Sequence, residues 1–162
     1  MLHQLAQNDL GDDGLAAVLK LLQSSPRAAE LRYLGLARNG IGDRGASTIA
    51  THLATSSATP CLQHLELRDN VIGDNGAAVL ARAVARTTAL RHLSLFHNAI
   101  GRSGATALAS ALAENTTLHA LDLRINLIEE GELRNLLQSV LQKQRDSPPQ
   151  QQPPPLLSLI HI

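Results

Sequence analysis

The amino-acid sequence predicts an α/β fold in which one strand–helix unit recurs about five times, and two observations predict it. The first is an asparagine that returns at intervals of 31, 31, 28 and 28 residues: Asn8, Asn39, Asn70, Asn98 and Asn126. The second is a constant frame around it, leucines before and alanines after, as in LQHLELRDNVIGDNGAAVLARAV from Leu62. Periods of about 20–50 residues are typical of stacked repeat architectures.

The leucines of the frame predict a short strand in each copy. In LxxLxL the second and third leucines alternate with polar or small residues, the period of two expected for a strand with one buried face. The asparagine follows where the chain leaves the strand. Its carboxamide both donates and accepts, so stacked asparagines can satisfy backbone groups of the turns. The aliphatic residue two positions later is expected to point inward: Leu10, Ile41, Ile72, Ile100 and Ile128.

The second half of each frame predicts a helix. Apolar residues at i, i+3, i+4 and i+7, such as Ala46, Ile49, Ala50 and Leu53, form one buried face. Glycine gives the turn before each helix its freedom. Aspartate at positions 12, 43 and 74 is expected to be the helix N-cap. In the fifth copy, glutamate replaces both framework glycines, at positions 129 and 132, which fits a C-terminal cap or an imperfect internal repeat.

The composition of the chain argues against several classes of function. The chain has 162 residues, with 14 basic residues against 14 acidic ones, which argues against a strongly basic nucleic-acid binder. A single cysteine, Cys61, excludes an internal disulfide framework and predicts a reducing, cytoplasmic compartment. We expect Cys61 to be a small, partly buried filler. Neither a signal peptide nor a membrane-spanning apolar run is visible in the sequence.

The frame LxxLxLxxNxIGDxGAxxLAxAL resembles the leucine-rich repeats of the ribonuclease-inhibitor type, also found in NOD-like receptors and Ran GTPase-activating proteins. The resemblance covers residues 1–143. It implies a right-handed solenoid, a horseshoe arc with parallel strands on the concave face and helices on the convex face. Strands pack about 4.8 Å apart and helices about 8–10 Å apart, so the stack must bend. Because the first copy begins inside its strand, we expect the chain to self-associate or fray over residues 1 to about 30.

The C-terminal segment has a different composition. Residues 144–156 are rich in proline and glutamine, which predicts a disordered tail, and a linker is favoured over an SH3-type ligand. The last six residues, 157–162 (LSLIHI), resemble the translation of a transposase adapter used in sequencing libraries. We therefore expect the natural chain to continue differently, and assign this segment no function.

No motif for chemistry rises above the repeat pattern. Residues 40–45 spell GxGxxG, but two of these glycines recur in other copies as repeat framework, so the repeat explanation is favoured over a nucleotide site. No nucleophile elbow, HExxH or P-loop lysine motif occurs in the sequence. We therefore predict no enzyme and no cofactor.

The histidines raise the alternative of a metal site. His64 and His92 occupy the same strand position in adjacent copies, and His97 and His119 lie on adjoining positions. Neighbouring imidazoles can bind zinc or copper. No cysteine joins them, however, and a repeat places any residue type in rows. The prediction is a solvated recognition surface and no metal.

Outward strand positions lie two, four and six residues before each asparagine, because the leucines take the alternate places. Both aromatic residues of the chain, Tyr33 and Phe96, fall on this face, and Phe96 stands between Arg68 and Arg124. Either Phe96 is a surface ring covered by arginine stems, or it is a hot spot for an apolar anchor bearing a carboxylate. The predicted partner-binding residues are Tyr33, Arg38, His64, Glu66, Arg68, His92, Phe96, His97, Asp122 and Arg124.

These observations predict a non-enzymatic protein–protein interaction module that binds another protein through its concave face, with no nucleic-acid or membrane partner. Two alternatives come from the family resemblance: a regulatory domain acting on a small GTPase, and the sensor end of a NOD-like receptor. All three use the same fold, so the fold alone does not choose among them.

Overall fold

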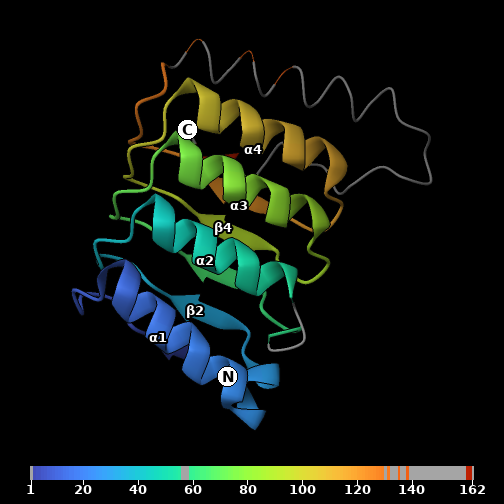
Figure 1. Ribbon diagram of the computed structural model, residues 1–162. Helices are drawn as coiled ribbons and strands as arrows, with labels where there is room; N and C mark the ends of the chain where they lie inside the picture. Colours follow the sequence, from blue (N-terminus) through green and yellow to red (C-terminus); the bar gives the residue numbers. More distant parts are fainter. Residues whose placement is uncertain are drawn as a thin grey trace.

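The computed structural model describes residues 2–55, 59–129, 131, 135, 138, 160 and 161. Strands and helices alternate along the chain (Figure 1). The strands are β1 (Leu2–Gln4), β2 (Tyr33–Gly35), β3 (His64–Glu66), β4 (His92–Ser94), β5 (Ala120–Asp122) and β6 (Ile160–His161). The helices are α1 (Gly11–Ser24), the 3-10 helix η1 (Pro26–Glu30), α2 (Asp43–Ala54), α3 (Asp74–Arg86) and α4 (Arg102–Glu114).

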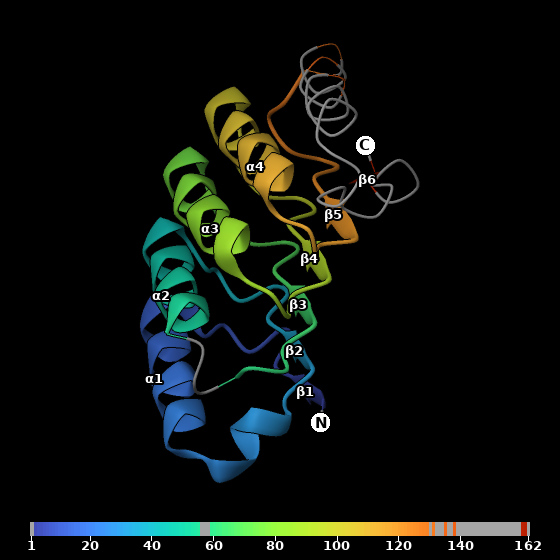
Figure 2. The ribbon, with the colours of Figure 1, turned by 90° about the vertical axis from the view of Figure 1, so that its right-hand side faces the viewer.

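All strands are parallel and lie in one sheet in chain order, from β1 to β6. Each strand pairs with the strand of the next repeat at equivalent positions. Leu34 thus pairs with Leu65, Leu65 with Leu93, and Leu93 with Leu121. Strands line one side of the arc and helices the other (Figure 2). The predicted fold class, an α/β solenoid of leucine-rich repeats, is confirmed.

The C-terminal end is described only in part. Strand β6 extends the sheet, with Ile160 beside Leu121 and His161 beside Asp122. The predicted tail, most of the final hexapeptide and the apolar face expected for a fifth helix lie outside the described residues. The proposed division at residues 143 and 156 therefore stays a prediction. Within the described part of the chain, no helix combines the length and apolar character needed to cross a membrane.

The core lies between the strand layer and the helix layer. The strand leucines of the inner repeats, such as Leu65 and Leu95, are fully buried, as are the alanines that let the helices approach, such as Ala77. Ile41, Ile72 and Ile100 point inward as predicted and have no exposed surface. Their counterparts in the first and fifth copies, Leu10 and Ile128, are half-buried.

The predicted asparagine ladder is present. Asn70 Oδ1 accepts hydrogen bonds from the backbone N–H groups of Asn39 and Ile41, both at 3.0 Å. Its Nδ2 donates to the carbonyls of Leu36 and Leu67, at 3.0 and 2.9 Å. One side chain thus joins two consecutive repeats by satisfying backbone groups that are buried away from water. Asn39, Asn98 and Asn126 make equivalent bonds.

The N-cap prediction for the aspartates is wrong. The N-caps of α2, α3 and α4 are glycines, without a capping side chain. Each aspartate instead reaches the helix start of the next repeat: Asp74 Oδ1 accepts from Gly101 N at 2.7 Å and from Gly104 N at 2.8 Å. A Cβ on Gly104 would lie 2.8 Å from that oxygen, so the framework glycine leaves room for the carboxylate. The carboxylate still meets the positive end of a helix, but one repeat further on.

The residue before each asparagine has a left-handed backbone. Five non-glycine residues share φ values between 51° and 61°: Gln7, Arg38, Asp69, His97 and Ile125. This conformation aims the backbone N–H at the next repeat, as where Asp69 N donates to Phe96 O at 2.9 Å. Asparagine, aspartate and histidine tolerate it, whereas a β-branched residue is strained there.

The prediction for Cys61 is also wrong, because its side chain is exposed. Cys61 precedes Leu62, where the chain crosses back from the helix layer to the strand layer. Leu62, only 2 % exposed, is the residue that fills the core at that point.

Replacing Asn70 by alanine is expected to lower the free energy of unfolding by about 3 kcal/mol or more, since several buried backbone groups lose their partners at once. Urea denaturation at neutral pH measures the loss. The control is Asn8→Ala: Asn8 is exposed and its Nδ2 bonds only carbonyls of its own turn, those of Leu5 and Ala6. Equal losses for the two variants would contradict the ladder's role.

Replacing Ile125 by asparagine is expected to raise the free energy of unfolding by about 1 kcal/mol, because asparagine relieves the left-handed strain. Because the Ile125 side chain is 63 % exposed, its replacement removes few packing contacts. Val71→Asn is the matched control: Val71 is also β-branched and 62 % exposed, but its φ is not positive. Thermal and urea unfolding that favour both variants alike would contradict the strain.

Candidate functional site

The outward side of the sheet presents polar and aromatic side chains between the buried leucines. On β3, β4 and β5 and the residues after them, His64, Glu66, His92, Phe96 and Asp122 are half-buried, and Arg68 and Arg124 are exposed. Leu95, next to Phe96, has no exposed surface. The predicted facing is therefore confirmed for these three repeats.

The second repeat differs from the prediction. Gly35 and Ala37 fall on outward positions but are buried. A Cβ on Gly35 would collide with the Gln4 side chain and lie 3.0 Å from the Tyr33 ring. Larger neighbours thus cover small residues at this end, and the open part of the face lies over β3, β4 and β5.

Three rings form a row across neighbouring strands. The imidazoles of His64 and His92 stack with centroids 4.3 Å apart and planes 3° from parallel. The Tyr33 ring lies 6.3 Å from His64 and is tilted by 38°. Parallel stacking keeps the nitrogen lone pairs of the two imidazoles in separate parallel planes, whereas metal ligands must converge on one point. The described residues contain no group of three or more possible ligands from His, Cys, Asp and Glu.

Burial shifts the acid–base properties of this row. Burial lowers the pKa of His92, and the nearby positive charges of His64, His119 and Arg91 lower it further. Burial raises the pKa of Glu66, and it likewise raises the pKa of the Tyr33 hydroxyl. His92 therefore stays neutral down to a lower pH than a free histidine would.

Phe96 has a cation fixed above it. The guanidinium carbon of Arg124 lies 5.5 Å from the centre of the Phe96 ring. Asp122 holds that guanidinium, accepting from Nε at 3.0 Å and from Nη2 at 2.7 Å. The predicted arginine–phenylalanine neighbourhood is present, with Arg68 one strand away. Cation–π and bidentate contacts both fix the arginine before any partner arrives.

Between these groups the face is hollowed. The depression has a volume of about 320 Å³. Its lining residues come from β3, β4, β5 and the residues following them: Glu66, Arg68, His92, Leu93, Ser94, Phe96, Ala120, Asp122 and Arg124. Six of the ten predicted partner-binding residues line it. His64 and Tyr33 adjoin it through the ring row.

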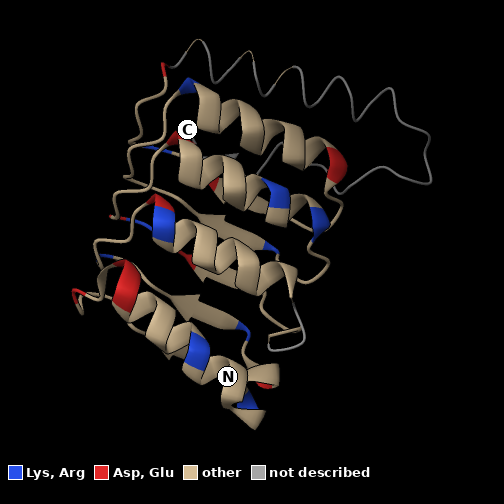
Figure 3. Ribbon diagram, viewed as in Figure 1, with Lys and Arg blue, Asp and Glu red and all other residues tan. Residues whose placement is uncertain are grey.

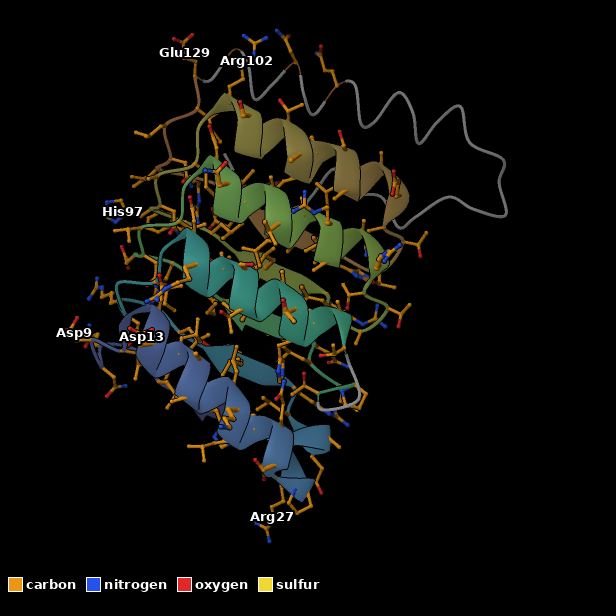
Figure 4. All side chains as sticks on the ribbon, in the orientation of Figure 1. Asp9, Asp13, Arg27, His97, Arg102 and Glu129 are labelled. Carbon is orange, nitrogen blue, oxygen red and sulfur yellow. The ribbon has the colours of Figure 1, made fainter. Side chains whose placement is uncertain are left out.

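Arg38 and His97 belong to a second group, at the edge where strands turn toward helices. Asp69 joins them: its Oδ2 lies 3.2 Å from Arg38 Nε, and its Oδ1 lies 2.6 Å from His97 Nδ1. The hydrogen bond from His97 lowers the pKa of Asp69, and Arg38 lowers it further. Figure 4 shows His97 projecting from this loop edge. The structure thus separates these two residues from the hollow.

Charges of both signs are distributed along the solenoid (Figure 3). Within the hollow, two carboxyl groups accompany two guanidinium groups. Phosphate backbones are bound by surfaces dominated by lysine and arginine. The mixed charge of the face is consistent with a protein partner.

Three buried polar residues were missed by sequence reasoning: Asn115, His52 and Thr59. Asn115 donates from Nδ2 to Val84 O at 2.6 Å and accepts from Leu118 N at 2.6 Å, joining the ends of α3 and α4. His52 is 3 % exposed, and its Nε2 is hydrogen-bonded to Thr59 Oγ1 at 3.1 Å. In the third and fourth copies alanine takes the place of His52, a difference that alignment of the copies reveals.

Burial lowers the pKa of His52. The unfolded chain therefore takes up that proton more readily than the folded one. Stability contributed by neutral His52 is present above the unfolded pKa, about 6.5, and is lost as the pH falls below it.

Replacing His64 by alanine is expected to raise the pKa of His92, because the ring that buries it and the charge that repels its proton both disappear. Titration of the histidine ring protons by NMR measures the shift. His3→Ala, on the edge strand β1, is the control and should leave the His92 titration unchanged. A His92 pKa that is unmoved or lower in His64→Ala would contradict the stacked pair.

Comparisons with known proteins agree with this geometry. The family model described as Leucine Rich repeat matches residues 30–50, 59–81 and 88–109. Among solved structures, the chain is similar to "Leiomodin-1 Actin-Binding Site 2 (ABS2)", with a TM-score of 0.66 and 25 % identity over 90 % of this chain and 83 % of that one. No curated protein sequence matched. The repeat frame, the stacked architecture and this structural neighbour together identify the fold as a leucine-rich repeat solenoid.

Proposed function

We propose that this chain is a non-enzymatic module that binds another protein through its concave face, with Phe96 and Arg124 at the centre of the contact. The supporting observation is the half-buried Phe96 ring, held under a guanidinium beside a hollow of about 320 Å³. Aromatic residues and arginine dominate the energetics of protein interfaces. An arginine already fixed by Asp122 loses little side-chain entropy on binding.

The partner group that best suits this centre is an apolar side chain seated against Phe96. Because Arg124 is engaged by Asp122 on both oxygens, the exposed Arg68 is the cation that would meet a neighbouring carboxylate. Half-buried Glu66, two residues before Arg68, adds a carboxyl group to the lining of the hollow. The site therefore suits an apolar anchor flanked by polar groups of both signs.

Actin is a specific candidate for the partner. The supporting observation is the structural similarity to a domain named as an actin-binding site of leiomodin-1, which extends over 90 % of this chain. Cosedimentation with filaments, and binding of labelled monomeric actin in solution, test this candidate directly. Binding that Phe96→Ala leaves intact would assign actin to another surface.

The ribonuclease-inhibitor subtype and a cytoplasmic location are part of the same proposal. Repeat intervals of 31 and 28 residues support the first, and a single cysteine supports the second. Regulation of a small GTPase and sensing within a NOD-like receptor stay predictions, because these roles share one solenoid and differ in partners and attached domains.

Phe96→Ala is expected to weaken partner binding by about 2 kcal/mol or more, roughly 30-fold in Kd, with folding nearly unchanged. The photo-crosslinker p-benzoylphenylalanine at position 91, beside the ring row, is expected to capture the partner. The same group at position 110, on the exposed side of α4, is the matched control. Mass spectrometry identifies the captured protein, and calorimetry measures its affinity.

Leu95→Ala provides the folding control and is expected to cost about 2–5 kcal/mol of stability. Equal destabilisation by Phe96→Ala would contradict the outward facing of that ring. Equal capture from positions 91 and 110, or undiminished affinity in Phe96→Ala, would place the interface elsewhere.

A further inference from the structure

The row of aromatic and imidazole rings across the strands ends at β5. Parallel register places Tyr33, His64, His92 and Ala120 side by side on β2, β3, β4 and β5. His64 covers one face of the His92 imidazole at 4.3 Å. The other face of that imidazole is turned toward β5, where the row continues with a methyl group.

The hollow lies over this methyl group. Ala120 and His92 both line it, and its volume of about 320 Å³ is ample for one aromatic side chain. Neighbouring strands are about 4.8 Å apart, close to the 4.3 Å between the stacked imidazoles. A ring seated above Ala120 would therefore stack on His92 and continue the row.

The residues that line the hollow favour an aromatic side chain with a hydrogen-bond donor at the edge of its ring. Phe96 lines the same hollow two outward positions beyond His92, past the end of β4, so the far part of the hollow carries a second aromatic ring. Glu66 and Asp122 supply carboxyl oxygens along the polar side. A donor at the edge of the ring, such as an indole N–H or a phenol O–H, complements these oxygens. A phosphate-bearing base would meet these two carboxyl groups as well as two guanidinium groups, of which Arg124 is already paired with Asp122.

We propose that the space over Ala120 is a subsite that receives one tryptophan or tyrosine side chain of the partner protein, stacked on His92. This inference rests on the proposed function and adds the identity of the anchor. The repeat provides the strand spacing, and the change from histidine to alanine in the fifth copy provides the opening.

The test uses small probes on the full chain labelled with ¹⁵N and ¹³C. Indole and p-cresol are expected to bind with Kd values on the order of millimolar, as suits ligands of so few atoms. They should shift the resonances of the Ala120 methyl and the His92 ring in a saturable way. Cyclohexanol, of similar size but without a ring current or a π face, is the control and should leave these signals in place.

Filling the space is the decisive variant. Ala120→Trp and Ala120→His both place a ring in the row and are expected to weaken indole binding at least tenfold. Ala99→Trp, at an exposed loop position, is the matched control and should bind indole as the unmodified chain does. His92→Ala, which removes the stacking face, should weaken indole binding by about three- to tenfold.

Several outcomes would overturn the subsite: indole shifts that spare these residues, unchanged indole binding in both Ala120 variants, or tighter binding of adenosine monophosphate than of indole. The partner assay separates this failure from failure of the proposed function. Ala120→Trp is expected to reduce capture from position 91 as strongly as Phe96→Ala does. Capture lost in Phe96→Ala but intact in Ala120→Trp would reject the subsite and leave the binding face standing.

Discussion

The structure depends on one constraint: each repeat buries backbone groups that only a neighbouring repeat can satisfy. Asparagine meets it at the turn, where Asn70 bonds backbone groups of two repeats. Aspartate meets it at the helix start, where Asp74 accepts from Gly101 and Gly104. The left-handed residue before each asparagine turns its N–H the same way. Each repeat is therefore stabilised by its contacts with the repeats beside it in the stack.

The same constraint builds the candidate site. Because the turns hold successive strands in one register, residues at equivalent positions fall side by side on the sheet. That alignment stacks His64 on His92 and brings Arg38, Asp69 and His97 together at the loop edge. The scaffold thus places the side chains of this face in rows, so a mutation in one row changes a defined part of it.

Departures from the repeat produce the individual features of the molecule. Alanine in place of histidine at position 120 opens the hollow, and glycine at position 35 lets neighbouring side chains close the face over β2. His52, where the third and fourth copies have alanine, puts an imidazole in the helix layer. Its Nδ1 is the single buried side-chain polar atom without a hydrogen-bond partner among the described residues. The residues shared by all repeats determine the fold, and these exceptions determine which side chains lie on its surface.

The sequence by itself determined the strand–helix alternation, the inward leucines, the asparagine ladder and the outward rows that hold Phe96 and the histidines. These features follow from the spacing of residues within one repeat and from the recurrence of that spacing in the other repeats. Only the tertiary structure decided that the aspartates bond the next helix, that Asp122 fixes Arg124 over Phe96, and that Arg38 and His97 form a separate group. Such contacts depend on side-chain directions and distances between repeats, and residue spacing along the chain does not specify them.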